Sequence, residues 1–424
     1  MISIIGLIIE FMLLAGFRPV VGEDIGDDIA LLLIFAFTVL FAYDMQHNRR
    51  LGSLKGPLLL GYLFRVGLLL MDVFGRSIFV LPNAASDDEM FYWGAVTYAR
   101  YGGWTRTNYP KVMGALFRYI GTNRLYGQFV SMLLAILALV LLAYALRELE
   151  ISDTTKYRVF QVVCLLPNFA ILSVLFMREA IITMFMTASF YSFICWMTRK
   201  KERYYLFALL WVLPAAWFHS GMVAALIGYM AIRFIYDNRQ GELRITATSV
   251  FLGFVLVMAA AFLFLNYGDA FLSKFAGVDS LEDIANTNDT AGSSYAQYVG
   301  NSSSPLSMAI YTLPRMIYFL FSPFPWQWRG ISDLIAFFFS GLYYLIVIIA
   351  AFRYLRDKNA PNHAVVFALL VLALVTAFVF GWGTSNTGTA SRHRDKLITL
   401  FALLWATSTD GQPLEWRITF SRLR

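Results

Sequence analysis

The sequence predicts an all-α protein that crosses a membrane many times and forms one integral membrane domain over residues 1–424. Two observations lead to this fold class. Apolar residues make up 59% of the chain and charged residues only 14%, whereas a soluble globular chain is about 25% charged. Apolar runs of about 20 residues, the length that a helix needs to cross a bilayer, recur from one end of the chain to the other.

About twelve of these runs are predicted to form transmembrane helices. The first run, MISIIGLIIEFMLLAG, lacks the basic region and the cleavage site of a removed signal peptide, so we expect it to remain as a span. The expected spans are 3–20, 29–44, 57–80, 125–146, 158–177, 179–198, 203–218, 220–236, 246–266, 332–352, 363–382 and 396–409.

The basic residues of the connecting loops predict the orientation of the chain. They follow the second, fourth, sixth, eighth and tenth spans and the last span. All of these loops lie on one side if both termini are cytoplasmic, as the positive-inside rule expects for a multi-pass protein of the plasma (inner) membrane. The net charge of +7 is then explained by topology, and we expect no nucleic-acid partner.

Two regions are predicted to lie on the outer side without crossing the membrane. The first large outer loop, 81–124, contains the short basic segment Pro110–Ile120. The second region, 267–330, contains Leu306–Trp328, in which prolines such as Pro314 are expected to break the helix. Prolines and tryptophans suit an interfacial or re-entrant segment better than a straight span.

The first outer loop contains an unusual acidic motif, SDDEMFYWGAVTYARYGGW. Asp87, Asp88 and Glu89 stand at the start of an amphipathic helix, where a carboxylate is stabilised by the helix dipole. One acid would suffice for this capping role, and three adjacent acids repel one another. We therefore predict that these carboxylates also have a function.

Other ionisable residues fall at the same membrane level. Arg178 and His219 lie at junctions between spans, and Arg315 lies in the second outer region. A basic cluster precedes the last span on the side where the topology rule disfavours basic residues; it contains Arg392, His393, Arg394 and Lys396. Ionisable residues at membrane depth are candidates for function.

Each of these residues also has a structural interpretation. Arg178 could pair with Glu179, and His219 could be a core histidine. The basic cluster could belong to a cytoplasmic loop, and an arginine at the membrane edge can extend to the lipid head groups. The convergence of acids, arginines and a histidine on one face favours a functional site over any of these single explanations.

The chemistry of this set points to phosphate. A carboxylate can act as a general base toward a hydroxyl or hold a divalent cation such as Mg²⁺ or Mn²⁺, although none is required. Arginines bind phosphate oxygens in a bidentate manner and stabilise a phosphate leaving group. The set therefore suits transfer of a group from a lipid phosphate to a hydroxyl acceptor at the outer face.

The acidic motif resembles the first outer loop of GT-C type membrane glycosyltransferases, in which an Asp-Glu pair precedes an aromatic helix and a Gly-Gly turn. The segment FMREAIITMFMTASFYSFICWMTRKKERYYLFALLWVLPAAWFHSGMVAAL is similar to EpsG-like and Wzy-like polysaccharide polymerases, and TASRHRDKLITLFALL resembles the Arg-rich outer loop of lipid-sugar transferases. The triple acid departs from the polymerase pattern, and no large soluble C-terminal domain follows.

This resemblance implies a GT-C-like, inverting glycosyltransferase, most closely a polymerase of oligosaccharide repeat units. Its donor and acceptor would be polyprenyl-linked saccharides, and other polysaccharide-assembly proteins would be its partners. The implied catalytic residues are Asp88 or Glu89, with Asp87 beside them. The implied substrate-binding residues are Arg178, His219, Arg392 and Arg394, and we expect Tyr92, Arg315 and Lys396 to line the same site.

Two other functions remain open. A flippase for lipid-linked oligosaccharides would use charges within a span, such as Arg65, Asp72 and Arg76 in the third span, although no internal repeat is visible. A membrane acyltransferase would use His219 as a base near the acids. The polar segment Asn266–Ser304 is either a saccharide-binding loop with stacking tyrosines or a solvated connector.

Overall fold

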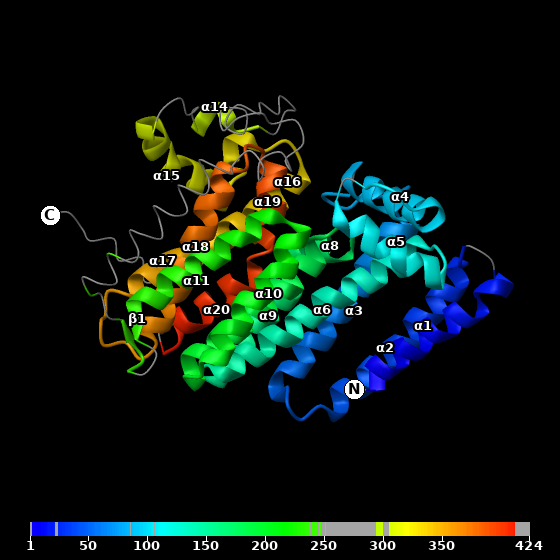
Figure 1. The fold of residues 1–424 in the computed structure, drawn as a ribbon, viewed down its shortest axis with the longest axis horizontal. Coiled ribbons are helices and arrows are strands. Elements are labelled where there is room, and N and C mark those ends of the chain that lie inside the picture. Colours follow the sequence, from blue (N-terminus) through cyan, green and yellow to red (C-terminus); the bar gives the residue numbers. More distant parts are fainter. Residues whose placement is uncertain are drawn as a thin grey trace.

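Long apolar helices make up most of the protein (Figure 1). The computed structural model describes residues 2–21, 24–84, 86–105, 107–237, 240–243, 246, 251, 294–299 and 305–411. The only sheet in these residues joins strand β1 (Tyr236–Asp237) to strand β2 (Glu242–Leu243) in antiparallel register. The predicted all-α class is therefore confirmed for this part of the chain.

The helices follow the apolar runs in chain order. The first half of the chain forms α1 (Ile2–Val21), α2 (Asp27–His47), η1 (Gly52–Leu54), α3 (Lys55–Phe74), α4 (Ser86–Tyr101), α5 (Asn108–Ile120), α6 (Arg124–Glu148), α7 (Asp153–Leu165), α8 (Pro167–Val174) and α9 (Glu179–Arg199). The second half forms α10 (Glu202–Phe218), η2 (Ser220–Val223), α11 (Ala224–Ile235), α14 (Ala296–Val299), α15 (Pro305–Phe321), η3 (Pro325–Gln327), α16 (Ile331–Ala336), η4 (Phe337–Gly341), α17 (Leu342–Tyr354), α18 (His363–Trp382), α19 (Thr387–Asp395) and α20 (Ile398–Thr409).

Six helical segments in the described residues are long and apolar enough to cross a membrane, or seven if one bent pair counts as a span. The six segments are Asp27–His47, Gly52–Phe74, Arg124–Glu148, Glu179–Arg199, Ile331–Tyr354 and His363–Trp382. The prediction of about twelve spans exceeds this number. Several of the other expected spans are apolar helices of only 10–17 residues, shorter than the roughly 20 residues that a straight span needs. The expected span 246–266 lies outside the described residues.

The expected span 158–177 is a bent pair of helices. Helices α7 and α8 meet at Leu166 with a bend of 50°. Pro167 occupies the first position of α8 and disfavours the helical conformation for the residue before it, and Leu166 is extended. The pair can still cross a membrane as one broken span, but the prediction, which considered hydropathy, did not include the bend.

In the second outer region a proline does not interrupt the helix. Pro314 was expected to break the segment, but α15 continues through it from Pro305 to Phe321. Apolar helices tolerate a proline when neighbouring groups satisfy the freed carbonyl. The expected span 57–80 also ends early, at Phe74, where Gly75 follows the helix.

Capping groups fix the helix ends that face the acidic motif. Helix α4 begins at Ser86 with all three acids in its first turn, as predicted. The side chain of Asn123 accepts a hydrogen bond from Tyr126 N (2.8 Å) and starts α6 at Arg124. Asn386 caps α19 in the same way. These caps decide which side chains face one another at this end of the bundle, called here the outer end.

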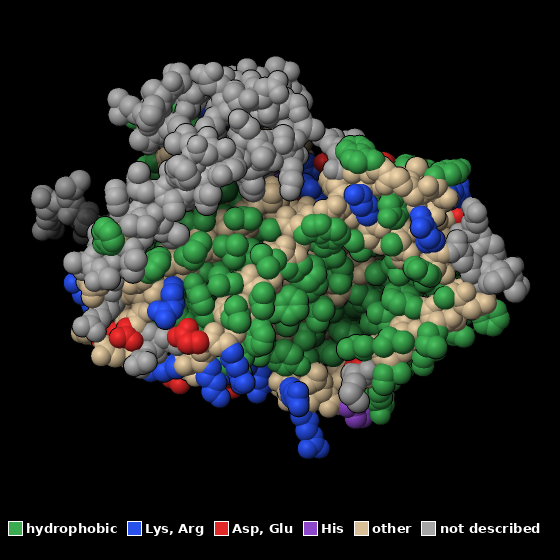
Figure 2. All heavy atoms as spheres, in the orientation of Figure 1, with side chains coloured by type: hydrophobic (Ala, Val, Ile, Leu, Met, Phe, Trp, Pro, Cys, Tyr) green, Lys and Arg blue, Asp and Glu red, His purple; other side chains and the backbone are tan. Residues whose placement is uncertain are grey.

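The opposite end carries the turns between the long helices. Arg199 at the end of α9 pairs with Glu148 at the end of α6, and Asp410 after α20 bonds to Ser152 before α7. The middle of the face in Figure 2 is covered by hydrophobic side chains, and Lys and Arg side chains gather along its lower edge. This distribution matches a protein whose middle contacts lipid and whose turns are basic.

Candidate functional site

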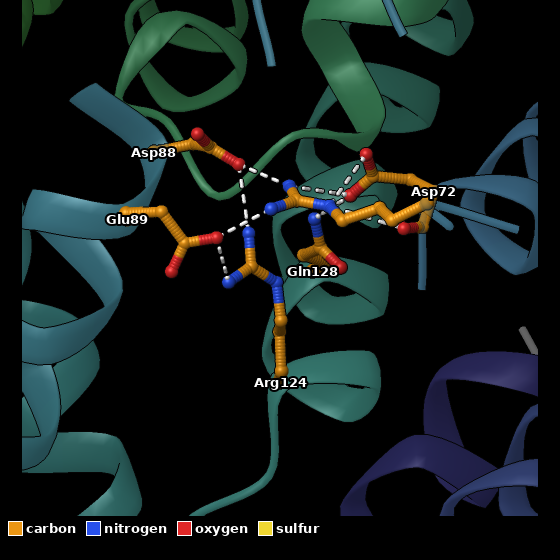
Figure 3. Close-up of polar contacts among 6 residues, drawn as sticks. Asp72, Asp88, Glu89, Arg124 and Gln128 are labelled. Atoms are coloured by element: carbon orange, nitrogen blue, oxygen red, sulfur yellow. Dashed lines mark hydrogen bonds and ion pairs between the residues drawn. The ribbon is translucent and has the colours of Figure 1, made fainter. Parts of the chain in front are cut away.

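The acidic motif meets two arginines at the outer end. We call Asp72, Arg76, Asp88, Glu89 and Arg124 the acid–arginine cluster. Asp72 lies in the last turn of α3, Arg76 just beyond it, the two other acids in the first turn of α4, and Arg124 at the start of α6. Three separate helix ends therefore supply one cluster, in which three carboxylates face two guanidinium groups (Figure 3).

The two guanidinium groups hold the same two carboxylates. Arg124 donates from Nη1 to Glu89 Oε1 (2.7 Å) and from Nη2 to Asp88 Oδ2 (2.7 Å). Arg76 donates to both of the same oxygens and also to Asp72, at 3.1 Å from Nη2 to Oδ2. Gln128 Nε2 donates to Asp72 Oδ2 (2.8 Å). Each acid is thus satisfied by charge-assisted hydrogen bonds, which are roughly twice as strong as neutral ones.

Burial differs among these groups. The side chains of Asp72 and Asp88 are fully buried, whereas those of Glu89 and both arginines remain partly exposed. Burial acts to lower the pKa of Arg76, but hydrogen bonds to Asp72 and Asp88 outweigh it and raise that pKa above the usual value. The charges of the cluster are therefore paired, and its partly exposed members, Glu89, Arg76 and Arg124, form what we call its open side.

The remaining acid of the motif links α4 to the C-terminal part of the chain. Asp87 pairs with Arg392 of α19, which is 305 positions away in sequence. Both side chains are partly exposed. The contact brings the predicted basic cluster beside the predicted acidic motif, and no feature of local sequence encodes it.

A pair of histidines lies next to Arg392. His219 Nε2 and His393 Nε2 are 2.7 Å apart. Gly221 N–H donates to His219 Nδ1 (3.2 Å), so neutral His219 carries its proton on Nε2. His393 Nδ1 lies 2.9 Å from the carbonyl oxygen of Thr389, which can only accept, so His393 carries its proton on Nδ1. His219 therefore donates to His393, and both rings are neutral.

The surroundings of this histidine pair favour the neutral form. Burial, and next the positive charge of Lys396, lower the pKa of both histidines well below the usual value. Both ring nitrogens of each histidine are already engaged. In this arrangement neither ring offers a free lone pair, so His219 lines the site but cannot act as a base without a change of conformation.

Lys396 and Arg178 also border the site. Lys396 Nζ lies 3.5 Å from Glu179 Oε1, and both side chains are buried. Arg178, predicted to bind substrate, donates from Nη1 to Phe218 O (3.2 Å) and lies over the ring of Phe91, 6.0 Å from its centroid. Arg178 thus connects α4, α9 and α10.

Tyr92 lies beneath Arg124, with the guanidinium carbon 5.3 Å from the ring centroid. This contact is a cation–π interaction in the acid–arginine cluster itself. The aromatic character of the motif therefore has a direct role beside its acids: it supports the arginine that holds them.

Two predicted arginines are bound elsewhere. Arg394 is fully buried and donates to Ser340 Oγ (2.7 Å), to Phe319 O (3.2 Å), to Ala336 O (3.0 Å) and to Ser322 O. Arg315 is buried against the ring of Trp382, 4.4 Å from its centroid. These contacts join α15, α16 and α18–α19, and they place both arginines in packing roles.

The tyrosines expected to stack on sugars also have partners. Tyr295 is buried and donates to Thr384 O (2.9 Å), and Tyr298 stacks on Tyr318 with centroids 5.7 Å apart. The rest of the loop Asn266–Ser304, apart from 294–299, lies outside the described residues.

Sequence reasoning did not place Arg76, Arg124 and Gln128 in the site, and it assigned Asp72 and Arg76 to the alternative transport function. A signal was present for the arginines. Both stand at the ends of long apolar runs, on the side predicted to be the outer one, where the positive-inside rule disfavours basic residues. An arginine that departs from this rule near a carboxylate motif is a candidate partner for those acids.

Among the residues that the structure describes, no group of three or more His, Cys, Asp or Glu side chains is arranged to hold a metal ion. The carboxylates of the acid–arginine cluster are instead occupied by guanidinium groups. Comparison with protein-family models, with curated proteins and with solved structures found no match for this chain.

Proposed function

We propose that this protein is an inverting membrane glycosyltransferase that uses a polyprenyl-(pyro)phosphate saccharide as donor and a second lipid-linked saccharide as acceptor. In its fullest form the proposal is a GT-C-like polymerase of oligosaccharide repeat units for a surface polysaccharide. The supporting observation is the junction of the acid–arginine cluster with Arg392 of α19, which gathers carboxylates and partly exposed guanidinium groups at one end of an apolar bundle.

The arrangement supports an exchange in which a donor phosphate replaces the carboxylates as the partner of the two arginines. In the structure, Arg76 and Arg124 give their donors to Asp88 and Glu89. A phosphate presents oxygens of the same spacing to an arginine fork. A donor phosphate that enters from the open side would take over these donors and release a carboxylate to accept a proton.

In the proposed reaction, Asp88 or Glu89 accepts the proton of an acceptor hydroxyl, and that oxygen forms a bond to the anomeric carbon of the donor. The bond from this carbon to the phosphate oxygen breaks, with inversion, and the phosphate keeps the electron pair. Arg76, Arg124 and Arg392 stabilise its charge, which is the kind of electrostatic effect that dominates many enzymatic rates. Arg178, Tyr92 and Lys396 border this site, and no step is assigned to a metal.

The same proposal fixes the orientation. The basic turns at the end opposite the acid–arginine cluster would face the cytoplasm, as would both termini, and the cluster would face the outer side of the plasma membrane. Donor, acceptor and bilayer would be the partners, together with other polysaccharide-assembly proteins.

The contacts of four residues weaken the alternative functions. Arg65, a candidate for a flippase pathway, donates to Cys164 O (2.6 Å), Gly61 O and Ser173 Oγ, so its guanidinium is engaged in helix packing. Asp72 and Arg76 belong to the acid–arginine cluster. An acyltransferase would need a free imidazole, whereas His219 is bound to His393.

The test is turnover by the purified protein with polyprenyl-diphosphate oligosaccharides, read by gel and mass spectrometry. We expect a ladder of products from the wild type and its loss in Asp88→Asn, Glu89→Gln or Arg178→Ala. The matched control is Arg100→Gln, because the Arg100–Asp24 pair is an exposed arginine–carboxylate contact outside the cluster. It should keep wild-type turnover.

The other outcomes separate the functions. A product one saccharide larger than the acceptor, without a ladder, would replace the polymerase by a single-addition transferase. Intact substrate binding with no transfer in well-folded wild type would reject the enzyme and favour the flippase. Equal loss in Arg100→Gln would show that the cluster is not the site.

A further inference from the structure

A cavity of about 350 Å³ opens between α4, α5 and the loop that joins them. Its walls include Trp93, Tyr98 and Trp104. Trp93 and Trp104 are 59% and 84% exposed, so their rings are open to a ligand. A cavity of this size falls within the range of small-molecule sites, about 300–1,000 Å³.

Polar groups lie among these rings. Thr97, Thr105 and Thr107 all belong to the lining. Thr97 is exposed, and Thr105 Oγ1 donates to Thr107 O (2.7 Å), whereas the Thr107 hydroxyl itself is buried. The hydroxyls of Thr97 and Thr105 are therefore the side-chain groups that offer hydrogen bonds to a polar ligand.

Two glycines shape the walls of the cavity. Gly102 has φ +69°, a conformation that favours glycine, and it forms part of the lining. Gly94 lies against Pro110, where an added Cβ would come within 3.3 Å of the proline ring, so it permits the close approach of α4 and α5.

We propose that this cavity binds a saccharide ring of the acceptor. The C–H face of a sugar packs on aromatic rings such as Trp93 and Trp104, and its hydroxyls match the threonine hydroxyls. Lipid anchoring is the main alternative use of exposed tryptophans at a membrane surface. A flat lipid-facing belt needs no hollow, whereas Trp93 and Trp104 line one together with threonines, so the cavity favours the saccharide.

The cavity and the proposed catalytic site share helix α4. Met90 and Phe91, which line the cavity, directly follow Glu89 in sequence. Phe91 also lies beneath the guanidinium of Arg178. The inference rests on the proposed function for the role of the saccharide as acceptor, but the binding of a saccharide can be tested without any transfer.

Photocrosslinking identifies the occupant whatever the identity of the sugar. The photoreactive residue p-benzoylphenylalanine would replace Trp104 in the full-length protein in its native cells. Mass spectrometry of the labelled peptide then distinguishes sugar fragment ions from fatty-acyl fragments. The matched control carries the same probe at Trp326, which is also exposed but lies outside the cavity lining.

We expect sugar adducts at position 104 and not at position 326. Adding Trp93→Ala to the Trp104 probe should lower the sugar label about tenfold, as expected for the loss of one stacking contact, while Trp93→Phe should preserve it. Size-exclusion profiles would confirm that each variant folds. Fatty-acyl adducts alone at position 104, or sugar label equal at both positions, would overturn the proposal.

The design separates this inference from the proposed function. Asp88→Asn is expected to keep the sugar label at position 104 while losing transfer. Sugar label in a wild type that shows no transfer would reject the glycosyltransferase and leave the binding cavity. Transfer without any sugar label at position 104 would support the glycosyltransferase and reject the saccharide cavity.

Discussion

Arg392 and Arg394 lie two residues apart on the short helix α19, but their guanidinium groups have opposite surroundings. Arg392 is partly exposed and pairs with one carboxylate, Asp87 of α4. Arg394 is fully buried and bonds to Ser340 and to three backbone carbonyls, with no carboxylate among these partners. One helix therefore presents one arginine to the open outer surface and holds another within the bundle.

The difference separates two uses of arginine in an apolar protein. An arginine bound to buried carbonyls fixes the positions of the helices that supply them, and its loss leaves those carbonyls unsatisfied. An arginine bound to a partly exposed carboxylate can exchange that partner for another anion, such as a phosphate. By this criterion Arg76, Arg124 and Arg392 are candidates for substrate contact, and Arg65 and Arg394 are structural.

Loss of Arg394 should have the largest effect on stability. Arg394→Gln cannot reach the carbonyls of Phe319, Ala336 and Ser322 together, and each buried unsatisfied group costs about 1–3 kcal/mol. We expect a loss of about 3–6 kcal/mol, a large part of the roughly 5–15 kcal/mol that stabilises a typical domain. Thermal unfolding in detergent measures it. Unfolding within about 2 °C of the wild type would contradict the structural role.

Loss of Arg392 should affect transfer and spare stability. Arg392→Gln removes a partly exposed ion pair, which contributes at most about 1 kcal/mol to folding. If the guanidinium holds the leaving phosphate, the rate should fall about 10²–10³-fold. Initial rates and melting curves on the same preparation separate the two effects. Arg392→Lys is the matched variant, since it keeps the charge but loses the planar fork. A rate that is unchanged in Arg392→Gln would remove Arg392 from the site.

Features that depend on local sequence were the ones that could be predicted. Hydropathy predicted the all-α class and the positions of most long helices, because each apolar run is a local property. Hydropathy did not show the bend at Leu166, and the rule that a proline breaks a helix failed at Pro314, because the effect of a proline depends on which neighbouring groups satisfy the backbone.

The sequence predicted some residues of the candidate site but not how they pair. The run of three acids pointed to Asp88, a basic residue on the predicted outer side pointed to Arg392, and the structure brings Asp87 and Arg392 into contact. No local pattern distinguishes Arg392 from Arg394, since their difference arises from the packing of α19 against α15 and α16. Arg124 was overlooked because its partners lie 35 and 36 positions away.

The histidine pair should make stability depend on pH. Burial lowers the pKa of His219 and His393 below the unfolded value of 6.5, so acid favours the unfolded state, which binds more protons. Their contribution is fully present above pH 6.5 and is lost as pH falls below it, by up to about 1.4 kcal/mol per pH unit for each histidine. The positive groups Lys396, Arg178 and Arg392 strengthen this trend.

Melting curves between pH 7.5 and 5.5 measure this effect, which is expected to be smaller than that of Arg394→Gln. The melting temperature should fall with acid in the wild type. The double variant His219→Gln/His393→Gln should lose most of this slope. A wild type that becomes more stable on acidification, or a double variant with an unchanged slope, would show that the pair is not held neutral.

The smallest effect is expected at the opposite end of the bundle, where Arg199 forms a bidentate pair with Glu148. Like the acid–arginine cluster it joins a guanidinium to carboxylate oxygens, but it is a single pair that is partly exposed and lies among basic turns. Glu148→Gln should cost at most about 1 kcal/mol, and because salt screens exposed charges, the difference from wild type should vanish in high salt. Melting curves and transfer rates test this together. Glu148→Gln could instead slow transfer as much as Arg392→Gln does. That result would contradict the assignment of the site to the outer end, because a pair at the opposite end would then matter equally.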